Sequence, residues 1–125
     1  AKAKAHVHPS PPSGRNTMYE VVVSPEAEAD LDRIIRYIAA DLRNPPAATA
    51  LADKIEARLC ELKTMPGKFS FCKDAFLRAM GYRRAQVGNH QIIYRIDETA
   101  KRVLIVHFYH TLQDYESNLL HFTGK

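Results

Sequence analysis

The sequence predicts an α+β fold, in which an antiparallel helical hairpin packs on a mainly antiparallel four-stranded sheet in the order β-α-α-β-β-β-α. Three observations predict it. A β-branched run, YEVVV, ends at a Ser-Pro pair; two segments of helical periodicity flank a Pro-Pro pair; and three strand-like segments follow. The chain has 125 residues, of which 46% are hydrophobic and 26% charged, a composition typical of one globular domain.

The domain is expected to span residues 18–125. Residues 1–17 contain three prolines, one glycine and a single branched aliphatic residue. A segment with so few apolar residues buries too little apolar area to offset the conformational entropy that it would lose on becoming ordered. We interpret residues 1–17 as a flexible leader or a remnant of cloning.

The first strand is predicted over residues 19–23, and Ser24 and Pro25 are the expected cap and first residue of a helix. Apolar residues at helical spacing continue to Leu42, and the Asn44-Pro45-Pro46 turn ends this helix. A second helix ends at Met65-Pro66-Gly67 and completes the hairpin. We expect its acidic outer face to be solvated surface, formed by Asp30, Asp32, Asp53 and Glu56.

Residues 68–80 are predicted to be irregular. The strands Tyr82–Val87 and His90–Ile96 meet across Gly88-Asn89, a two-residue turn typical of a β-hairpin. A third strand is predicted over Arg102–Phe108, and residues 111–120 are predicted as a short terminal helix.

The net charge of +4 is unevenly distributed. The first 17 residues are basic, residues 18–62 are acidic, and residues 63–125 are basic again. Between Lys63 and Arg95, seven basic residues are opposed only by Asp74. The basic C-terminal half of the chain is therefore suited to binding a polyanion or an acidic protein partner. Within residues 68–80, aromatic residues alternate with Lys68, Lys73 and Arg78, a pattern that serves either base stacking or the anchoring of a loop.

Several classes of function are not expected. No apolar run approaches the ~20 residues of a membrane span, and no signal peptide is recognisable. Cys60 and Cys72 are too few for a disulfide scaffold and are interpreted as reduced thiols of a cytoplasmic protein. No Gly-rich phosphate loop or metal-ligand cluster is present, so we expect neither a cofactor nor a metal.

The chain resembles the RelE/ParE superfamily of bacterial toxins from type II toxin–antitoxin systems. The resemblance spans Tyr19–Leu120 and is carried by YEVVVSPEAEADLDRIIRYIAADLRNPPAA, LKTMP, GYRRAQVGNHQIIYRID and VLIVHFYHTLQDYESNLL. It implies a toxin held inactive by a cognate protein antitoxin. RelE-type members cleave mRNA on the ribosome without a metal, whereas ParE-type members bind and poison DNA gyrase.

Metal-free RNA cleavage needs an acid–base group and fixed cations. His110 is the candidate acid–base residue, because imidazole titrates near neutral pH and some nuclease members use a histidine at this place. Arg83, Arg84 and Arg95 are the candidate cations, since guanidinium binds phosphate through two parallel hydrogen bonds. Arg83 and Arg84 must face opposite sides of their strand.

Two departures from the nuclease pattern keep the alternative open. Gln91 stands where nuclease members have an arginine that contacts phosphate, and Thr111 stands where they have a terminal catalytic tyrosine. Arg95 lies on the same strand face as Gln91 and is the expected substitute for that charge. His90 is either a second proton-transfer group that contacts RNA with Gln91 or a surface histidine of the turn. We predict a RelE-like mRNA endonuclease, with a ParE-like gyrase poison as the alternative.

Overall fold

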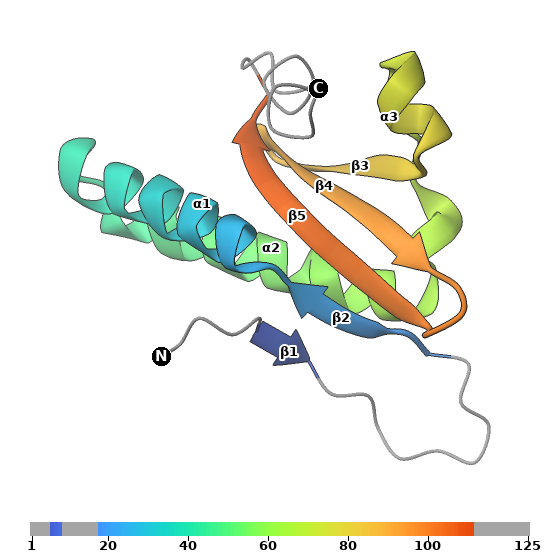
Figure 1. Ribbon diagram of the computed structural model, residues 1–125. Helices are drawn as coiled ribbons and strands as arrows, with labels where there is room; N and C mark the ends of the chain where they lie inside the picture. Colours follow the sequence, from blue (N-terminus) through green and yellow to red (C-terminus); the bar gives the residue numbers. More distant parts are fainter. Residues whose placement is uncertain (1–5, 9–17, 112–125) are drawn as a thin grey trace.

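The computed structural model describes residues 6–8 and 18–111 and has the predicted α+β architecture (Figure 1). Its sheet has five strands in the spatial order β1-β2-β5-β4-β3. β2 and β5 are parallel, and all other neighbours are antiparallel. The strands are β1 (His6–His8), β2 (Glu20–Val23), β3 (Tyr82–Val87), β4 (His90–Asp97) and β5 (Arg102–His110).

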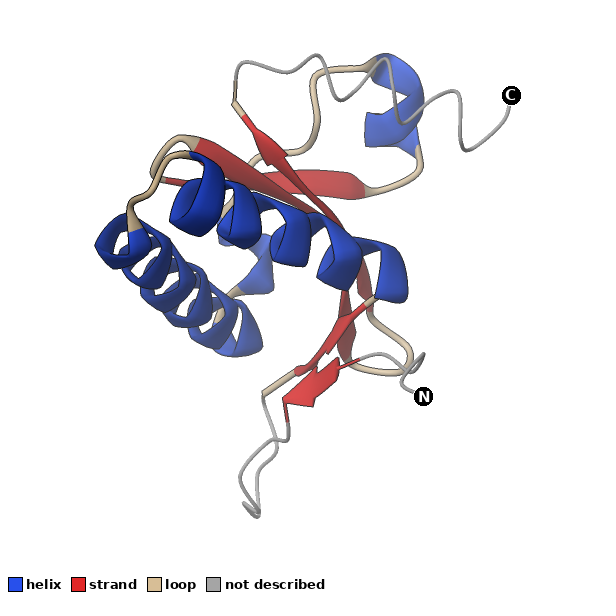
Figure 2. Ribbon diagram, turned by 90° about the vertical axis from the view of Figure 1, so that its left-hand side faces the viewer, coloured by secondary structure: helices blue, strands red, loops and turns tan. Residues whose placement is uncertain are grey.

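The helical hairpin consists of α1 (Pro25–Arg36) and α2 (Pro45–Thr64), which lie side by side and cover one face of the sheet (Figure 2). The Ser24 hydroxyl accepts a hydrogen bond from the Ala27 N–H at 3.0 Å, the N-cap that the sequence predicts. Beyond Arg36 the chain continues as a π-helical turn over Tyr37–Asp41. The first helical segment therefore reaches the predicted end, but its last turn is wider than an α-helix.

The main core lies between this hairpin and the sheet. One stripe of α2 packs against strand residues that are almost fully buried, and Tyr94 and Phe108 are the largest of them. The Tyr94 hydroxyl donates a hydrogen bond of 2.5 Å to the Pro66 carbonyl, which ties β4 to the segment after α2. The stripe of α2 comprises Leu51, Ile55, Leu59 and Leu62.

A second, smaller core lies on the opposite face of the sheet. Here α3 (Ala75–Ala79) buries Leu77 against Cys72 and Ile93. The Asp74 carboxylate caps α3 by accepting hydrogen bonds from the Phe76 and Leu77 N–H groups. The prediction that residues 68–80 are irregular is therefore wrong at this point, because a five-residue helix is too short to show a periodic pattern.

β5 contains a β-bulge. Ile93 of β4 pairs with His107 and Tyr94 pairs with Ile105, so Val106 has no partner in β4. The extra residue shifts the alternation of the strand, so that Val103, Ile105 and Phe108 are the residues that enter the main core. The bulge also places His107 beside α1, which matters for the polar cluster described below.

The N-terminal part of the chain contributes a strand that the sequence does not predict. From their composition, residues 1–17 are expected to lie outside the fold, whereas the structure pairs His6–His8 with Val21–Val23 along the edge of β2. This fifth strand supplies partners for the backbone groups of an edge strand, a long-range effect that composition does not reveal. The predicted terminal helix lies outside the described residues, apart from Thr111.

Candidate functional site

Arg83 and Arg84 lie on opposite faces of β3, as the strand period requires. Arg83 Nη1 donates to the Phe69 carbonyl at 2.6 Å and to the Gly67 carbonyl at 3.3 Å. Its guanidinium carbon also lies 3.9 Å from the centroid of the Phe71 ring. Arg83 therefore holds the segment after α2 against the sheet, and its Nη1 group is engaged within the protein.

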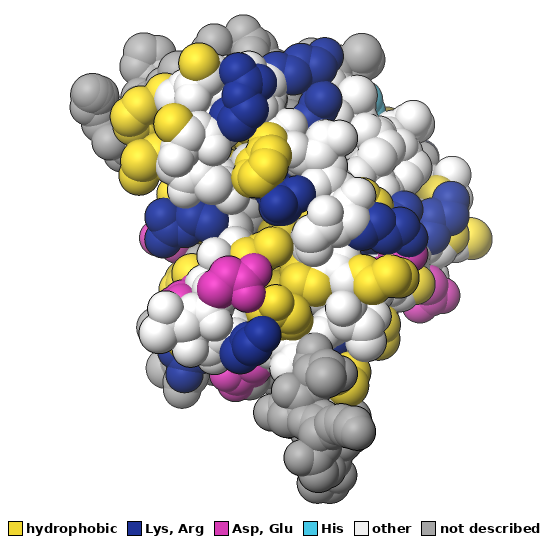
Figure 3. Space-filling view, turned by 90° about the vertical axis from the view of Figure 1, so that its right-hand side faces the viewer, with side chains coloured by type: hydrophobic (Ala, Val, Ile, Leu, Met, Phe, Trp, Pro, Cys, Tyr) yellow, Lys and Arg dark blue, Asp and Glu magenta, His cyan; other side chains and the backbone are white. Residues whose placement is uncertain are grey.

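Arg84 lines a cavity of about 320 Å³ beside the outer edge of β3. We call this cavity the β3-edge pocket, and its lining residues are Lys68, Phe69, Ser70, Arg84, Gln86 and Gln91. Three of the predicted site residues, Lys68, Arg84 and Gln91, thus meet in one place. Arg84 Nε is buried without a hydrogen-bond partner. Figure 3 shows Lys and Arg side chains intermixed with hydrophobic ones over the molecular face that includes this edge.

Gln91, which stands where the nuclease pattern has an arginine, takes part in a network of side-chain amide hydrogen bonds. Its Nε2 donates to Gln86 Oε1 at 3.1 Å, and Gln86 Nε2 donates to Thr111 Oγ1 at 2.8 Å. Gln91 is only 7% exposed. The two positions that depart from the nuclease pattern, Gln91 and Thr111, are therefore joined through Gln86.

Arg95 lies far from Gln91 and His110, although the register of β3 and β4 places it close to Arg83. It pairs with Tyr82 across β3 and β4, and its guanidinium carbon is 5.4 Å from the centroid of the Tyr82 ring. It shares a face with Gln91, as predicted, but four residues of extended strand separate the two by about 13 Å. His110 pairs with His90, one residue farther still from Arg95. The structure does not bring Arg95 and His110 together.

His90 and His110 form a cross-strand pair at the start of β4 and the end of β5. Their ring centroids are 5.0 Å apart in an edge-to-face arrangement, and His90 Nδ1 is buried without a hydrogen-bond partner. Burial, and to a smaller degree the charge of His110, lowers the pKa of His90. His90 is therefore a partly buried neutral imidazole near neutral pH, and it lies against the second imidazole ring of His110.

The lowered pKa of His90 predicts a loss of stability in mild acid. The unfolded chain binds a proton at His90 near its ordinary pKa of 6.5, whereas the folded chain binds it only at lower pH. The contribution of neutral His90 to the free energy of unfolding is therefore complete above pH 6.5, and it is lost as the pH falls below this value. Urea unfolding between pH 7.5 and 5 should show a steeper decline for the parent chain than for His90→Gln. Equal slopes for the two proteins would contradict the assignment.

The remaining predicted RNA contacts are placed apart. Lys68 Nζ forms an ion pair with Glu61 and lies 5.4 Å from the centroid of the Phe69 ring. Hydrogen bonds from Lys68 and Arg58 lower the pKa of Glu61, so the carboxylate stays charged. Arg78 donates from Nη1 to the Lys73 carbonyl at 3.2 Å, beside α3. Lys73 and Arg78 thus lie near α3, outside the β3-edge pocket.

A polar cluster at the bulge of β5 was not predicted. Asp30 is 8% exposed, and its carboxylate accepts hydrogen bonds from Arg33 Nη2 at 2.8 Å, His107 Nδ1 at 2.7 Å and the Phe108 N–H at 3.2 Å. Burial raises the pKa of Asp30, but these hydrogen bonds outweigh it and the net shift is downward. Burial and the charge of Asp30 raise the pKa of neighbouring Tyr109. The expectation that Asp30 is solvated surface is therefore wrong.

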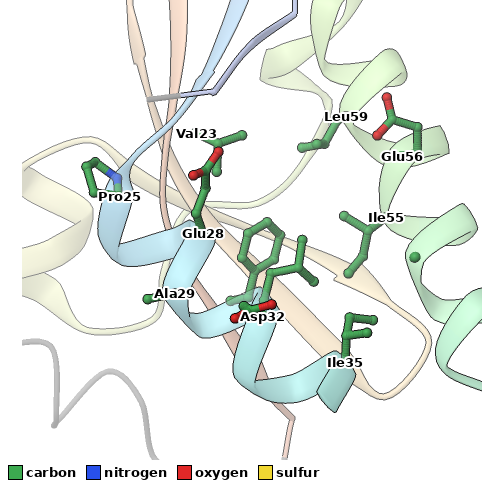
Figure 4. A pocket seen from close by; sticks show the side chains of 12 residues that line it. Val23, Pro25, Glu28, Ala29, Asp32, Ile35, Ile55, Glu56 and Leu59 are labelled. Atoms are coloured by element: carbon green, nitrogen blue, oxygen red, sulfur yellow. The ribbon is translucent and has the colours of Figure 1, made fainter. Parts of the chain in front are cut away.

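An apolar groove of about 670 Å³ runs between the two long helices. Ile35 of α1 and Ile55 and Leu59 of α2 point into it, and the carboxylates of Glu28 and Glu56 lie along it (Figure 4). Its lining combines apolar side chains with acidic ones, in contrast to the β3-edge pocket. The chain thus offers two chemically distinct concave surfaces.

Two negative findings apply to residues 6–8 and 18–111. In these ranges no group of three or more His, Cys, Asp or Glu side chains is placed to hold a metal ion. No helix within them has the length and apolar character needed to cross a membrane.

Comparison with known proteins defines the class of this fold. Residues 21–115 match the family model described as the ParE toxin of the type II toxin–antitoxin system parDE. Among curated protein sequences no significant match is found. The fold is that of a small α+β toxin of a type II system. The chain belongs to the ParE toxin family, within the RelE/ParE superfamily that the sequence resembles.

Two solved structures share the fold. One is the chromosomal ParDE toxin–antitoxin system from P. aeruginosa, with a TM-score of 0.60 and 17% identity over 76% of this chain and 97% of that chain. The other is the RelBE2 toxin–antitoxin complex from Mycobacterium tuberculosis, with a TM-score of 0.55 and 21% identity over 75% of this chain and 92% of that chain. Both branches of the superfamily are therefore represented among the similar structures.

Proposed function

We propose that this chain is a toxin that is neutralised by a cognate protein antitoxin and acts by binding DNA gyrase, without catalysis of its own. One observation carries the choice of target. The candidate acid–base residue His110 and the cation Arg95 occupy distant parts of the sheet, and Arg83 is bound to backbone carbonyls. Acid–base catalysis at a phosphodiester requires these groups within hydrogen-bond reach of one substrate.

Two further features support a protein partner. The groove between α1 and α2 and the β3-edge pocket are concave surfaces of opposite charge character, which suits recognition of folded or helical protein segments. The membership in the ParE family and the likeness to two toxin–antitoxin systems support an antitoxin as one partner of the chain.

The alternative is a RelE-like, metal-independent mRNA endonuclease that acts on the ribosome. The observation in its favour is the contact between His90 and His110, because a neutral imidazole beside a second imidazole supplies a base and an acid. Gln91 stands in place of the arginine of the nuclease pattern, and the unpaired cation that lines the same pocket, Arg84, is not joined there by Arg95 or His110. We therefore rank this alternative second.

The test compares the two targets directly with the purified chain. We expect inhibition of supercoiling and accumulation of cleaved DNA with gyrase, and intact mRNA on programmed ribosomes. His110→Ala should keep the gyrase activity of the parent. Urea unfolding of each variant serves as the control for folding.

The opposite pattern would overturn the proposal. Cut mRNA that disappears with His110→Ala, at a loss of ~10²–10⁴-fold in rate, would establish His110 as an acid or base. An increase in cutting with Gln91→Arg would support the same conclusion, because the substitution restores the cation of the nuclease pattern.

A further inference from the structure

The β3-edge pocket contains a cation that nothing in the described part of the chain neutralises. The Arg84 side chain forms no ion pair with a described residue, and its Nε–H has no acceptor although the atom is buried. Lys68, the other cation of the pocket, is paired with Glu61. The pocket therefore combines one uncompensated guanidinium with neutral polar side chains, an arrangement that favours a single bound anion.

The surroundings of the pocket favour a carboxylate over a nucleic-acid strand. Phe71 follows Ser70 but does not line the pocket, and one face of its ring carries the Arg83 guanidinium at 3.9 Å, so this ring offers the pocket no platform for a stacking base. A nucleic-acid strand also brings a charge with every phosphate, and Arg84 is the one unpaired cation among the lining residues.

We propose that the β3-edge pocket binds the side-chain carboxylate of an acidic residue in a protein partner, with Arg84 as the anchoring cation. The planar guanidinium binds a carboxylate by donating two parallel hydrogen bonds. The inference deepens the proposed function, because it states how a toxin that acts through protein contacts recognises an acidic segment.

The test uses peptides and the NMR signal of the arginine Nε–H groups at pH 6.5. The probe is the capped pentapeptide Ac-Ala-Leu-Glu-Leu-Ala-NH₂, compared with its Gln twin and with the pentanucleotide r(UUUUU). Arg84→Gln assigns the Arg84 signal by its disappearance. We expect the Glu peptide to shift that signal and to bind at least about tenfold more tightly than the Gln peptide.

The variants separate charge from geometry. Arg84→Gln should weaken binding of the Glu peptide by about tenfold or more, and Arg84→Lys, which keeps the charge without the planar fork, should lie in between. Lys54→Gln removes an exposed positive charge from α2, away from the pocket, and should leave binding unchanged. Unfolding midpoints confirm that each variant is folded.

Three results would overturn the inference: equal binding of the Glu and Gln peptides, parent-like binding by Arg84→Gln, or a shift of the Arg84 signal by r(UUUUU) and not by the Glu peptide. The titration contains neither gyrase nor ribosomes. Its failure is therefore distinguishable from failure of the proposed function, which is measured by supercoiling and mRNA cleavage.

Discussion

Replacing Asp30 by asparagine is expected to lower the free energy of unfolding by about 2–3 kcal/mol, because the variant loses charge-assisted hydrogen bonds in a nearly buried position. The Asp30 carboxylate accepts from Arg33, His107 and the Phe108 N–H at once. An asparagine offers one oxygen to these donors and turns an N–H₂ group toward the rest. Urea unfolding at pH 7 measures the loss.

Asp32 provides the matched control on the same helix. Its carboxylate is paired with Arg36, but both side chains are about 70% exposed. Asp32→Asn should therefore change the free energy of unfolding by at most about 1 kcal/mol. Equal losses for the two variants would show that the bulge does not depend on the buried carboxylate.

Asp30 also predicts a specific response to acid. Its folded pKa lies below the ordinary value of 3.8, so its contribution is full above pH 3.8 and is lost as the pH falls further through the folded pKa. The difference in stability between the parent and Asp30→Asn should therefore shrink in strong acid. This range lies well below the one in which His90 titrates, so the two effects are separable.

The position of Asp30 shows where the sequence was informative and where it was not. Asp30 follows Ala27 by three residues and precedes Ile34 by four, which places it within the apolar stripe of the helix. This spacing was a usable signal of burial. The partner could not be predicted, because the bulge at Val106 that brings His107 and the Phe108 N–H to α1 depends on the pairing of β4 with β5.

The strands of the hairpin were predictable because their rules are local. The Gly88-Asn89 turn fixes the pairing of Val87 with His90 and hence of Gln86 with Gln91, two residues that line the β3-edge pocket. Gly88 has φ +58°, which the turn requires and glycine adopts freely. The distance between Arg95 and His110 follows from the same register. The separation of Arg95 and His110 could have been estimated from the number of residues between them in the predicted strands. The resemblance to nucleases instead suggested that the two side chains lie together in one site.

Other elements depend on contacts that the sequence does not encode locally. α3 has five residues, and its one readable signal is Asp74 as a cap before Ala75. The segment Ser70–Cys72 runs along the outer edge of β3, where the Arg84 N–H donates to the Ser70 carbonyl and the Cys72 N–H donates to the Tyr82 carbonyl. This backbone pairing, and not periodicity, positions Arg84 beside Ser70 and creates the pocket.

Tyr94→Phe is expected to give the second large effect: the substitution should lower the free energy of unfolding at pH 8 and raise it at high pH. Its side chain is fully buried, and its hydroxyl donates to the Pro66 carbonyl at 2.5 Å. At pH 8, Tyr94→Phe should cost about 1–2 kcal/mol, because the Pro66 carbonyl loses its donor inside the protein. Tyr94→Ala should cost about 3–5 kcal/mol, because it also leaves a cavity.

Burial raises the pKa of Tyr94 to about 12, against a smaller opposing effect of Arg83. Between pH 10 and 12 the unfolded chain therefore loses the tyrosine proton while the folded chain retains it, and stability falls as the pH rises. Each pH unit in this range costs the parent about 1.4 kcal/mol, a loss that phenylalanine does not suffer. The deficit of Tyr94→Phe should consequently vanish near pH 11 and become an advantage above it. Urea unfolding of both proteins from pH 8 to 11.5 tests this, and a difference that stays constant with pH would show that the hydroxyl is not held in its neutral form by the core.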